Sequence, residues 1–277
     1  MVAAPELRNN QLEHPLMSRV IAHRGARSSA PENTIEALVR AHELGATFCE
    51  IDVMLSKDKE VFINHDFTVD RCSNGVGNFG DKTAAELLAL DVGSWFSKEY
   101  TGAQYPTLKA AVNKCQQLGL GLNVEIKHLR KKADDECLEG SEIAEREREV
   151  AMQTARVIRE MNANTSALVF SSFSVWALEV IQREMPLVKR ALLVEAIPDD
   201  WQDQVTRLGC SSINFNSKLA TKEQVEKIRQ CGVEMYSYTV NDPERAWELM
   251  QWGVSGVFAD CPAEIESYLK INSQSRG

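Results

Sequence analysis

Short apolar runs alternate with amphipathic segments along almost the whole chain. Eight runs have the length and the β-branched or aromatic content of buried strands. They are 19–23, 48–53, 122–127, 167–172, 190–194, 212–216, 234–240 and 256–260. Between most of them the spacing predicts helices, clearest at 34–44, 150–161, 175–183, 222–230 and 243–252. Eight strands that alternate with helices predict an α/β fold, a (β/α)8 TIM barrel.

The first predicted helix follows the first strand closely, with the segment P-E-N-T before it. Asn33 and Glu36 form a pair that resembles a capping box, and Gly45 is placed to end the helix. The alternative architecture is an open, doubly wound sheet. Such a sheet commonly carries G-x-G-x-x-G after its first strand, and no such motif occurs there.

The second strand is followed by a predicted hairpin. Residues 53–66 read V-M-L-S-K-D-K-E-V-F-I-N-H-D, in which a polar stretch separates two apolar runs. A two-residue turn at Asp58-Lys59 would place Asp52 opposite His65. The ninth apolar run, 61–64, therefore need not be a barrel strand, and the hairpin would return His65 toward the second strand.

Two segments break the alternation of strands and helices. Residues 66–107 are rich in turn-forming and aromatic residues, and are too long for a simple loop. We expect them to form a small insertion at the barrel mouth, within a single domain that spans 18–268. Residues 128–149 are a run of mixed charge, predicted as a solvated loop leading into a helix, with a lid as the alternative. Residues 1–17 are assigned to an N-terminal extension and 269–277 to a C-terminal tail.

The composition limits the possible functions. The chain has 277 residues, 44% of them hydrophobic, and a formal net charge of −9. Such a charge argues against nucleic-acid binding, and an anionic substrate would need local positive charge. The seven cysteines include no C-x-x-C pair, which is typical of reduced thiols. Neither a signal peptide nor an apolar run of 18 residues is evident, so we expect a cytoplasmic protein without membrane insertion. The sequence does not indicate an oligomeric state.

Charged side chains gather where the first three barrel strands end. In a (β/α)8 barrel these ends form the active face. Strand alternation places Glu50 and Asp52 on one face, and it does the same for Glu125 and Lys127. Three neighbouring carboxylates predict a site for one hard divalent cation, Mg²⁺ or Ca²⁺, with Mn²⁺ also suitable. The alternative is that Glu50 or Glu125 simply pairs with Lys127 inside the barrel.

Two histidines flank the predicted cation site, His23 at the end of the first strand and His65 at the end of the hairpin. A single histidine would more often have a structural role. Two beside an arginine and a cation suit phosphodiester cleavage, one as general base and the other as general acid. Arg24 would hold phosphoryl oxygens. Gly25 would let the backbone approach closely.

Taken together, these motifs resemble the glycerophosphodiester phosphodiesterase family, in particular its bacterial cytosolic members. The resemblance rests on H-R-G, A-P-E-N-T, E-I-D-V, F-I-N-H-D and V-E-I-K in this order. It continues through T-V-D-R-C-S-N-G-V-G and L-D-V-G-S-W-F to S-Y-T-V-N and G-V-F-A-D-C-P, and so covers about residues 18–268.

The resemblance implies a TIM barrel that hydrolyses glycerophosphodiesters, its small-molecule substrates, to sn-glycerol 3-phosphate and an alcohol. It assigns Glu50, Asp52 and Glu125 to the cation, and Arg24 and Lys127 to the phosphate. It also implies a route through a cyclic phosphate, formed when the glycerol 2-hydroxyl attacks phosphorus. His23 and His65 would be the acid/base pair, His23 for the attacking hydroxyl and His65 for the leaving alcohol, with the reverse assignment as the alternative and the head group open.

The chain departs from the family pattern at three positions. Ala26 stands where a second glycine is common, Tyr238 where relatives often have tryptophan, and Cys261 where they often have arginine or tyrosine. Three other functions also remain to be distinguished. They are a related barrel phospholipase or sphingomyelinase, a catalytically silent phosphodiester-binding barrel, and a metal-dependent aldolase or lyase.

Overall fold

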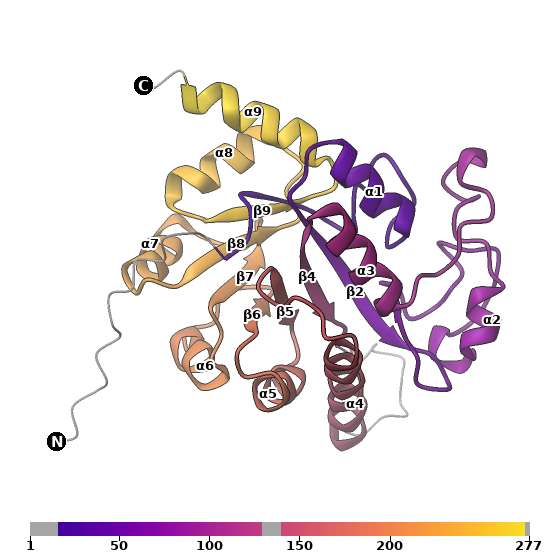
Figure 1. Cartoon of the computed structure of the whole chain (residues 1–277). Coiled ribbons are helices and arrows are strands. Elements are labelled where there is room, and N and C mark those ends of the chain that lie inside the picture. Colours follow the sequence, from indigo (N-terminus) through magenta and orange to yellow (C-terminus); the bar gives the residue numbers. More distant parts are fainter. Residues whose placement is uncertain (1–15, 129–139, 275–277) are drawn as a thin grey trace.

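The computed structural model describes residues 16–128 and 140–274, and within them eight parallel strands form a closed barrel (Figure 1). The strands are β1 (Val20–Ala22), β2 (Phe48–Leu55), β4 (Gly121–Ile126), β5 (Leu168–Ser172), β6 (Lys189–Val194), β7 (Ser212–Asn216), β8 (Glu234–Tyr238) and β9 (Gly256–Ala259). They pair in the order β1-β9-β8-β7-β6-β5-β4-β2, and a β1–β2 pairing closes the ring. The predicted TIM barrel is confirmed, and the open sheet is excluded.

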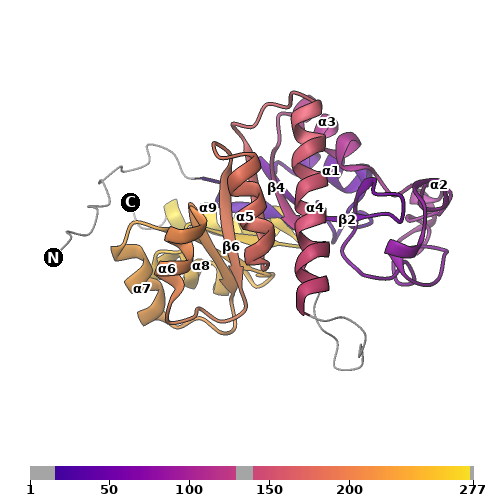
Figure 2. The ribbon, with the colours of Figure 1, turned by 90° about the horizontal axis from the view of Figure 1, so that it is seen from below.

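Helices cover the outside of the barrel (Figures 1 and 2). They are α1 (Ile35–Glu43), α3 (Leu108–Leu118), α4 (Gly140–Glu160), α5 (Val175–Glu184), α6 (Trp201–Leu208), α7 (Lys222–Gln230), α8 (Pro243–Trp252) and α9 (Pro262–Gln274). The prediction from the sequence did not include α3, α6 or α9, and it placed the start of α4 ten residues too late. Residues 269–274, assigned to a tail, belong to α9 and include the buried Leu269.

The barrel interior changes from apolar to charged along the strands. Its floor is a buried cluster that includes Met17, Ile21, Phe48, Val169, Tyr236 and Phe258. One level above, the buried Asn123 side chain donates to Ser171 Oγ at 2.8 Å. The next inward positions of β2 and β4 are Asp52 and Glu125, which are register partners. Because side chains alternate along a strand, Ile51 and Val53 of β2 and Val124 of β4 point outward into the core beneath the helices.

The hairpin that follows β2 has a different register from the predicted one. Strand β3 (Val61–Ile63) runs antiparallel to β2 with Val53 opposite Ile63, so Asp52 lies opposite Asn64 rather than His65. The turn has three residues between Ser56 and Glu60, and Lys59 adopts a left-handed conformation with φ of 70°. The left-handed Lys59 lengthens the loop by one residue compared with a two-residue turn, and this shifts every later pairing by one.

The start of α1 also differs from the prediction. Thr34, not Asn33, is the N-cap, and its hydroxyl accepts from the backbone N–H of Ala37 at 3.1 Å. Asn33 has a positive φ of 53° and turns its amide toward β2. There its Nδ2 donates to Asp52 Oδ2 at 2.9 Å, so this side chain serves the site instead of the helix.

Residues 66–107 lie beside the barrel, at the right of Figure 1, and they contribute aromatic rings to a buried cluster. Phe79 packs edge-on against Phe62 of β3 and against Tyr105. The segment also holds α2 (Ala84–Leu88), which a Thr83–Glu86 capping box begins, and two short 3₁₀ turns at Phe79–Asp81 and Lys98–Tyr100. Whether the segment is separable from the barrel stays a prediction.

Some predictions concern residues outside the described part of the chain. These include most of the N-terminal extension, residues 129–139 of the charged run and Cys137. The described cysteines are free thiols. Among the helices of the described segments, none combines the length and apolar character that a bilayer span requires.

Candidate active site

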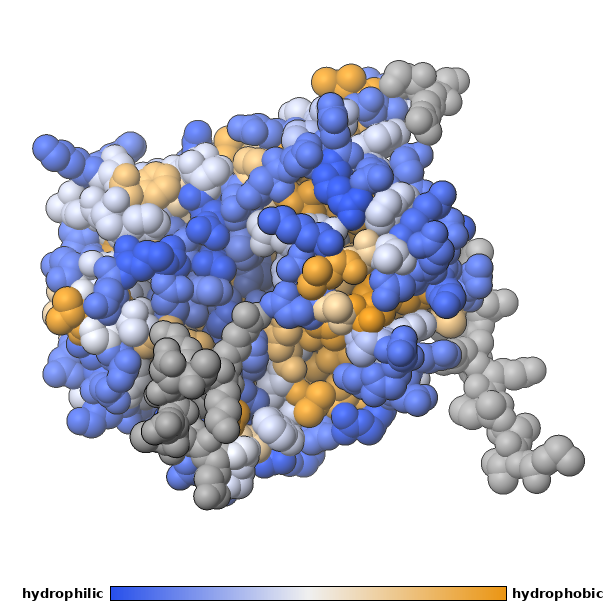
Figure 3. Space-filling model, turned by 180° about the vertical axis from the view of Figure 1, so that it is seen from behind, coloured by the Kyte–Doolittle hydropathy of each residue, from blue (hydrophilic) through white to orange (hydrophobic). Residues whose placement is uncertain are grey.

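A cavity of about 490 Å³ opens at the carboxyl ends of the barrel strands, a volume typical of small-molecule sites. Six of the seven predicted site residues line it: His23, Arg24, Glu50, His65, Glu125 and Lys127. Asp52 lies just below, 1% exposed. Figure 3, seen from the side opposite to Figure 1, shows hydrophilic residues on one side of the hollow and hydrophobic residues toward α6 and α7.

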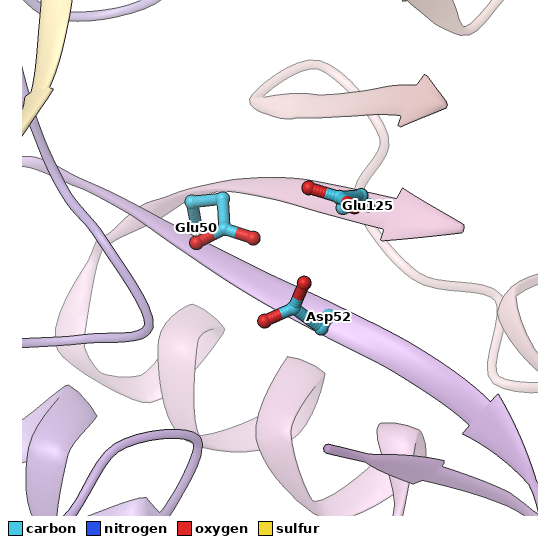
Figure 4. Close-up of side chains that lie close together, drawn as sticks. All are labelled: Glu50, Asp52 and Glu125. Carbon is cyan, nitrogen blue, oxygen red and sulfur yellow. The ribbon is translucent and has the colours of Figure 1, made fainter. Parts of the chain in front are cut away.

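Glu50, Asp52 and Glu125 form a cluster in which one oxygen of each carboxylate lies within 4.8 Å of the others. Figure 4 shows Glu50 and Asp52 on β2 and Glu125 on β4, with their carboxylates turned toward one another. The in-register pairing of Asp52 with Glu125 brings the two strands' charges together. Burial, together with the charges of Asp52 and Glu125, raises the pKa of Glu50 well above its usual value.

Two cations offset part of this negative charge. Lys127 Nζ lies 2.9 Å from Glu125 Oε1 and 3.1 Å from Asp52 Oδ1. Arg24 Nε lies 3.4 Å from Asp52 Oδ2. Although burial opposes it, the charges of Lys127, His65 and Arg24 lower the pKa of Asp52. The ion pair between Lys127 and Glu125 is the arrangement that the sequence analysis gave as the alternative to a cation site.

Glu50 distinguishes these two interpretations. Its Oε2 accepts the backbone N–H of Arg24 at 2.9 Å, but its Oε1 is buried without a hydrogen-bond partner. A buried carboxylate oxygen without a partner is costly, and it points to a further group at this position. Three carboxylates are ligands that hard divalent cations prefer. The residues present therefore fit a divalent cation, which Lys127 alone does not replace.

His23 is held by a carboxylate from the far end of the chain. Its Nδ1 lies 2.7 Å from Asp260 Oδ1, just after β9, and its Nε2 lies 3.9 Å from Glu50 Oε2. Although burial opposes it, the hydrogen bond with His23 helps to lower the pKa of Asp260 to about 2. The ionised Asp260 accepts from Nδ1–H, which leaves Nε2 of a neutral ring as the acceptor that faces the cluster. Burial lowers the pKa of His23 itself.

His65, which lines the same cavity, has the same arrangement. Its Nδ1 lies 2.7 Å from Asp66 Oδ1, and Asp66 also accepts from Arg71 Nε at 2.6 Å. The hydrogen bond with His65 is the main cause that lowers the pKa of Asp66 below its usual value. Both imidazoles are therefore fixed at Nδ1 by an ionised carboxylate.

The turn after β1 explains the sequence H-R-G. Arg24 has a positive φ of 54° and Gly25 one of 76°, so the chain reverses abruptly after His23. A Cβ at position 25 would lie 2.7 Å from the backbone of Ala37, so only glycine lets the turn pack against α1. The reversal turns the Arg24 N–H to Glu50 and its guanidinium to Glu32, whose Oε1 accepts from Nη1 at 2.7 Å.

The prediction from the sequence did not assign roles to several residues of the site. Asp66 follows His65 directly, and Asp260 ends the last predicted strand, so both were visible in quoted motifs. A general rule could have identified them, because a functional histidine is commonly held at Nδ1 by a carboxylate, and both carboxylates stand at ends of predicted elements. Asn33 was interpreted as a helix cap, and Glu32 received no role.

Comparisons with known proteins agree with this geometry. The family model described as the glycerophosphoryl diester phosphodiesterase family matches residues 23–264. A glycerophosphodiester phosphodiesterase of Caldanaerobacter subterraneus subsp. tengcongensis is 32% identical over 247 residues, which are 89% of this chain and 95% of the relative.

Solved structures give the same result. A phosphodiesterase of Oleispira antarctica, in complex with the product sn-glycerol-3-phosphate, has a TM-score of 0.82 and 33% identity, over 92% of this chain and 97% of the other. A glycerophosphodiester phosphodiesterase of Agrobacterium tumefaciens shares the fold, with a TM-score of 0.72 and 24% identity over 91% of this chain and 100% of the other. The chain thus belongs to the glycerophosphodiester phosphodiesterase family, whose activity its relatives carry.

Proposed function

We propose that this chain hydrolyses glycerophosphodiesters to sn-glycerol 3-phosphate and an alcohol, with a divalent cation and two histidines. The observation that carries the proposal is the pair of imidazoles, each held at Nδ1 by a carboxylate 2.7 Å away, that line one cavity together with carboxylates. The bound product of the Oleispira antarctica relative supports the glycerophosphate half of the substrate.

The cation would be held by Glu50, Asp52 and Glu125, and it would be Mg²⁺ or Ca²⁺, with Mn²⁺ also suitable. When bound, it supplies positive charge beside the phosphoryl group. Arg24 and Lys127, which line the same cavity, contribute fixed positive charge and N–H donors for the phosphoryl oxygens. Their placement would favour the transition state, in which negative charge on these oxygens increases.

In the first step the glycerol 2-hydroxyl attacks phosphorus, and a new P–O bond forms. The proton of this hydroxyl goes to Nε2 of His23, which is neutral because burial lowers its pKa. The P–O bond to the head-group alcohol breaks, and the leaving oxygen takes a proton from Nε2 of His65. The products of this step are a five-membered cyclic phosphate and the free alcohol.

In the second step water attacks the cyclic phosphate, and the two histidines exchange roles. His65 now accepts a proton from the water, and His23 returns its proton to the 2-oxygen as that P–O bond breaks. Both imidazoles regain their starting protonation, and sn-glycerol 3-phosphate leaves. Asp260 and Asp66 keep Nδ1–H of each ring donating, so that both proton transfers use Nε2.

The experiment measures release of sn-glycerol 3-phosphate from glycerophosphocholine and glycerophosphoethanolamine, with a coupled dehydrogenase as the readout. The enzyme is treated with EDTA, and Mg²⁺, Ca²⁺ or Mn²⁺ is then restored separately. Release that depends on a restored cation supports the proposal and ranks the ions. Absence of release with every ion and both substrates would refute it in favour of a silent binder or a lipid phosphodiesterase.

A matched histidine serves as the control for the two-histidine mechanism. His42 is an exposed residue of α1. His42→Ala should keep wild-type turnover, whereas His23→Ala and His65→Ala should lose it. Detection of the cyclic phosphate in the reaction mixture by ³¹P spectroscopy would support the two-step route, and direct hydrolysis without it would contradict that route.

A further inference from the structure

One carboxylate that the proposed mechanism does not use lies at the centre of a network of ion pairs. The side chain of Glu32 is 3% exposed, and three arginines contact it. Arg24 Nη1 donates to Oε1 at 2.7 Å, and Arg27 Nη2 lies 3.1 Å from Oε2. Arg71 makes two hydrogen bonds, from Nη2 to Oε1 at 2.8 Å and from Nη1 to Oε2 at 2.9 Å. Glu32 therefore fixes three guanidinium groups, two from the turn after β1 and one from the segment 66–107.

The first arm of this network leads from Glu32 to His65. Arg71 uses Nη1 and Nη2 for Glu32, and its remaining Nε donates to Asp66 Oδ2 at 2.6 Å. The other oxygen of Asp66 bonds His65 Nδ1. A guanidinium is planar and its donors are at fixed angles, so anchoring two of them on Glu32 sets the direction of the third. The orientation of Asp66, and hence of the ring, follows from this anchor.

The second arm leads from Glu32 to His23. Arg27 Nη2 lies 3.1 Å from Glu32 Oε2, and its Nε lies 3.7 Å from Asp260 Oδ1. This is the oxygen of Asp260 that bonds His23 Nδ1, while Oδ2 accepts from Asn241 at 2.7 Å. Arg27 thus links Glu32 to the carboxylate that orients the His23 ring.

We propose that Glu32 is a positioning residue that aligns both imidazoles at once, through Arg71–Asp66 to His65 and through Arg27–Asp260 to His23. The inference rests on the proposed function, because it assigns the alignment of the same two histidines. A single carboxylate at the branch point couples the two proton carriers, so that a displacement of one imidazole is transmitted to the other. Arg71 belongs to residues 66–107, so this coupling also ties that segment to the chemistry.

The first experiment compares wild type with Glu32→Gln, saturated with Mg²⁺ and assayed on glycerophosphocholine. Misplaced catalytic groups impair turnover more than binding, so we expect kcat to fall about 100-fold while KM changes less than about threefold. Glu234→Gln is the matched control. Its carboxylate also accepts hydrogen bonds, from Leu16 N and Tyr236 Oη, but at the opposite end of the barrel.

A readout that does not depend on activity follows the two rings directly. In ¹⁵N-resolved imidazole spectra, assigned with His23→Ala and His65→Ala, the Nδ1 signals of both histidines should shift in Glu32→Gln. The same signals should remain unchanged in Glu234→Gln. A folded Glu32→Gln protein with wild-type kcat and unshifted Nδ1 signals would overturn the proposal.

Arg71 provides a second variant in case Glu32→Gln does not fold, since its side chain is 43% exposed. Arg71→Met should lower kcat about tenfold in wild type but less than about twofold in an Asp66→Asn background, because the first arm is already broken there. Equal losses in both backgrounds would refute the first arm. Arg71→Lys keeps the charge without the planar fork, and we expect it to rescue only in part.

The two proposals fail in different ways. If His23→Ala and His65→Ala retain wild-type kcat, the proposed mechanism is wrong, whatever the spectra show. If these two variants are inactive while Glu32→Gln is unaffected in kcat and spectra, the mechanism stands and the positioning role of Glu32 is wrong.

Discussion

The two halves of the barrel mouth differ in chemistry. The half built from β1 to β4 supplies His23, Arg24, the three carboxylates, His65 and Lys127. The half built from β5 to β9 supplies mainly Phe173, Leu193, Tyr238 and Phe258 to the same cavity, and its polar lining residues are Ser171, Glu195 and Thr239. The centroid of the Phe173 ring lies 4.7 Å from the centroid of the His128 ring and 5.9 Å from that of the Tyr238 ring.

This difference teaches that the charged side chains of the first half are held in place by ionic partners, whereas the mainly apolar wall of the second half contributes a surface of fixed shape. Every charged side chain of the first half has an ionic partner, and the partners continue outward to Glu32 and Arg71. In the second half the hydroxyl of Tyr238 donates to Val194 O at 2.7 Å, which fixes the ring from outside the reacting groups. We therefore expect changes in the first half to affect turnover, and changes in the second half to affect binding.

The largest expected effect comes from removing one of the two proposed proton carriers. His23→Ala or His65→Ala should lower kcat by up to about 10⁴-fold, the contribution of a well-placed general acid or base. The measurement is steady-state turnover of glycerophosphocholine at saturating Mg²⁺. A variant that keeps wild-type kcat would remove that histidine from the chemistry and break the contrast between the two halves.

Removal of the divalent cation should have the next largest effect. We expect activity to fall by about 10³-fold after chelation, since a bound cation contributes several kcal/mol of charge stabilisation. Titration with Mg²⁺ should restore it, and Glu125→Gln should need a higher concentration for half-maximal activity. Full turnover by protein shown to be free of metal would contradict the three-carboxylate site.

The charged half should also make the fold sensitive to acid. Although burial opposes it, the hydrogen bond from Arg71 and the charges of Arg24 and Arg27 lower the pKa of Glu32 from 4.5 to about 2. A lowered pKa means that this stabilisation is present above pH 4.5 and is lost as pH falls toward 2. It corresponds to about 3 kcal/mol of unfolding free energy at neutral pH.

Urea unfolding of wild type and Glu32→Gln at several pH values measures this contribution. The difference in unfolding free energy should be full at pH 7 and should narrow below pH 4.5. Glu234→Gln controls for loss of a hydrogen-bonded carboxylate elsewhere. A difference between wild type and Glu32→Gln that stays constant down to pH 3 would contradict the assignment.

The smallest expected effect tests the apolar half. Phe173→Ala should raise KM about tenfold and leave kcat within about threefold, because removal of an aromatic surface weakens binding without touching the proton carriers. Leu187→Ala is the control, since Leu187 is 94% exposed. A large loss of kcat with unchanged KM would show that the aromatic wall takes part in the chemistry.

The barrel and most of its site were predictable because strand ends carry charge in a regular pattern. The alternation in E-I-D and E-I-K placed three carboxylates on one face, as the structure has them. The helix α3 was missed because much of its buried face is small, with Ala111 and Cys115 beside Leu108 and Val112. The hairpin register was wrong by one residue because the left-handed Lys59 is not a glycine and gave no signal.

The contacts that orient the site were not predictable from local pattern. Glu32 and Arg71 are 39 residues apart, and Asn33 and Asp52 are 19 apart. Such pairings depend on how the loops fold over the barrel mouth. Local sequence favoured a helix cap for Asn33, and the requirement to hydrogen-bond the buried Asp52 overrode this preference.

The bond between His23 and Asp260 joins residues 237 apart in the chain, across the seam where β1 meets β9. Contacts this distant in sequence form only after the intervening chain has been organised, and they slow folding. During synthesis His23 emerges from the ribosome long before Asp260 does. A nascent chain that already contains every proposed cation ligand and both histidines therefore still lacks the carboxylate that orients His23, and we expect activity only after the final strand closes the ring.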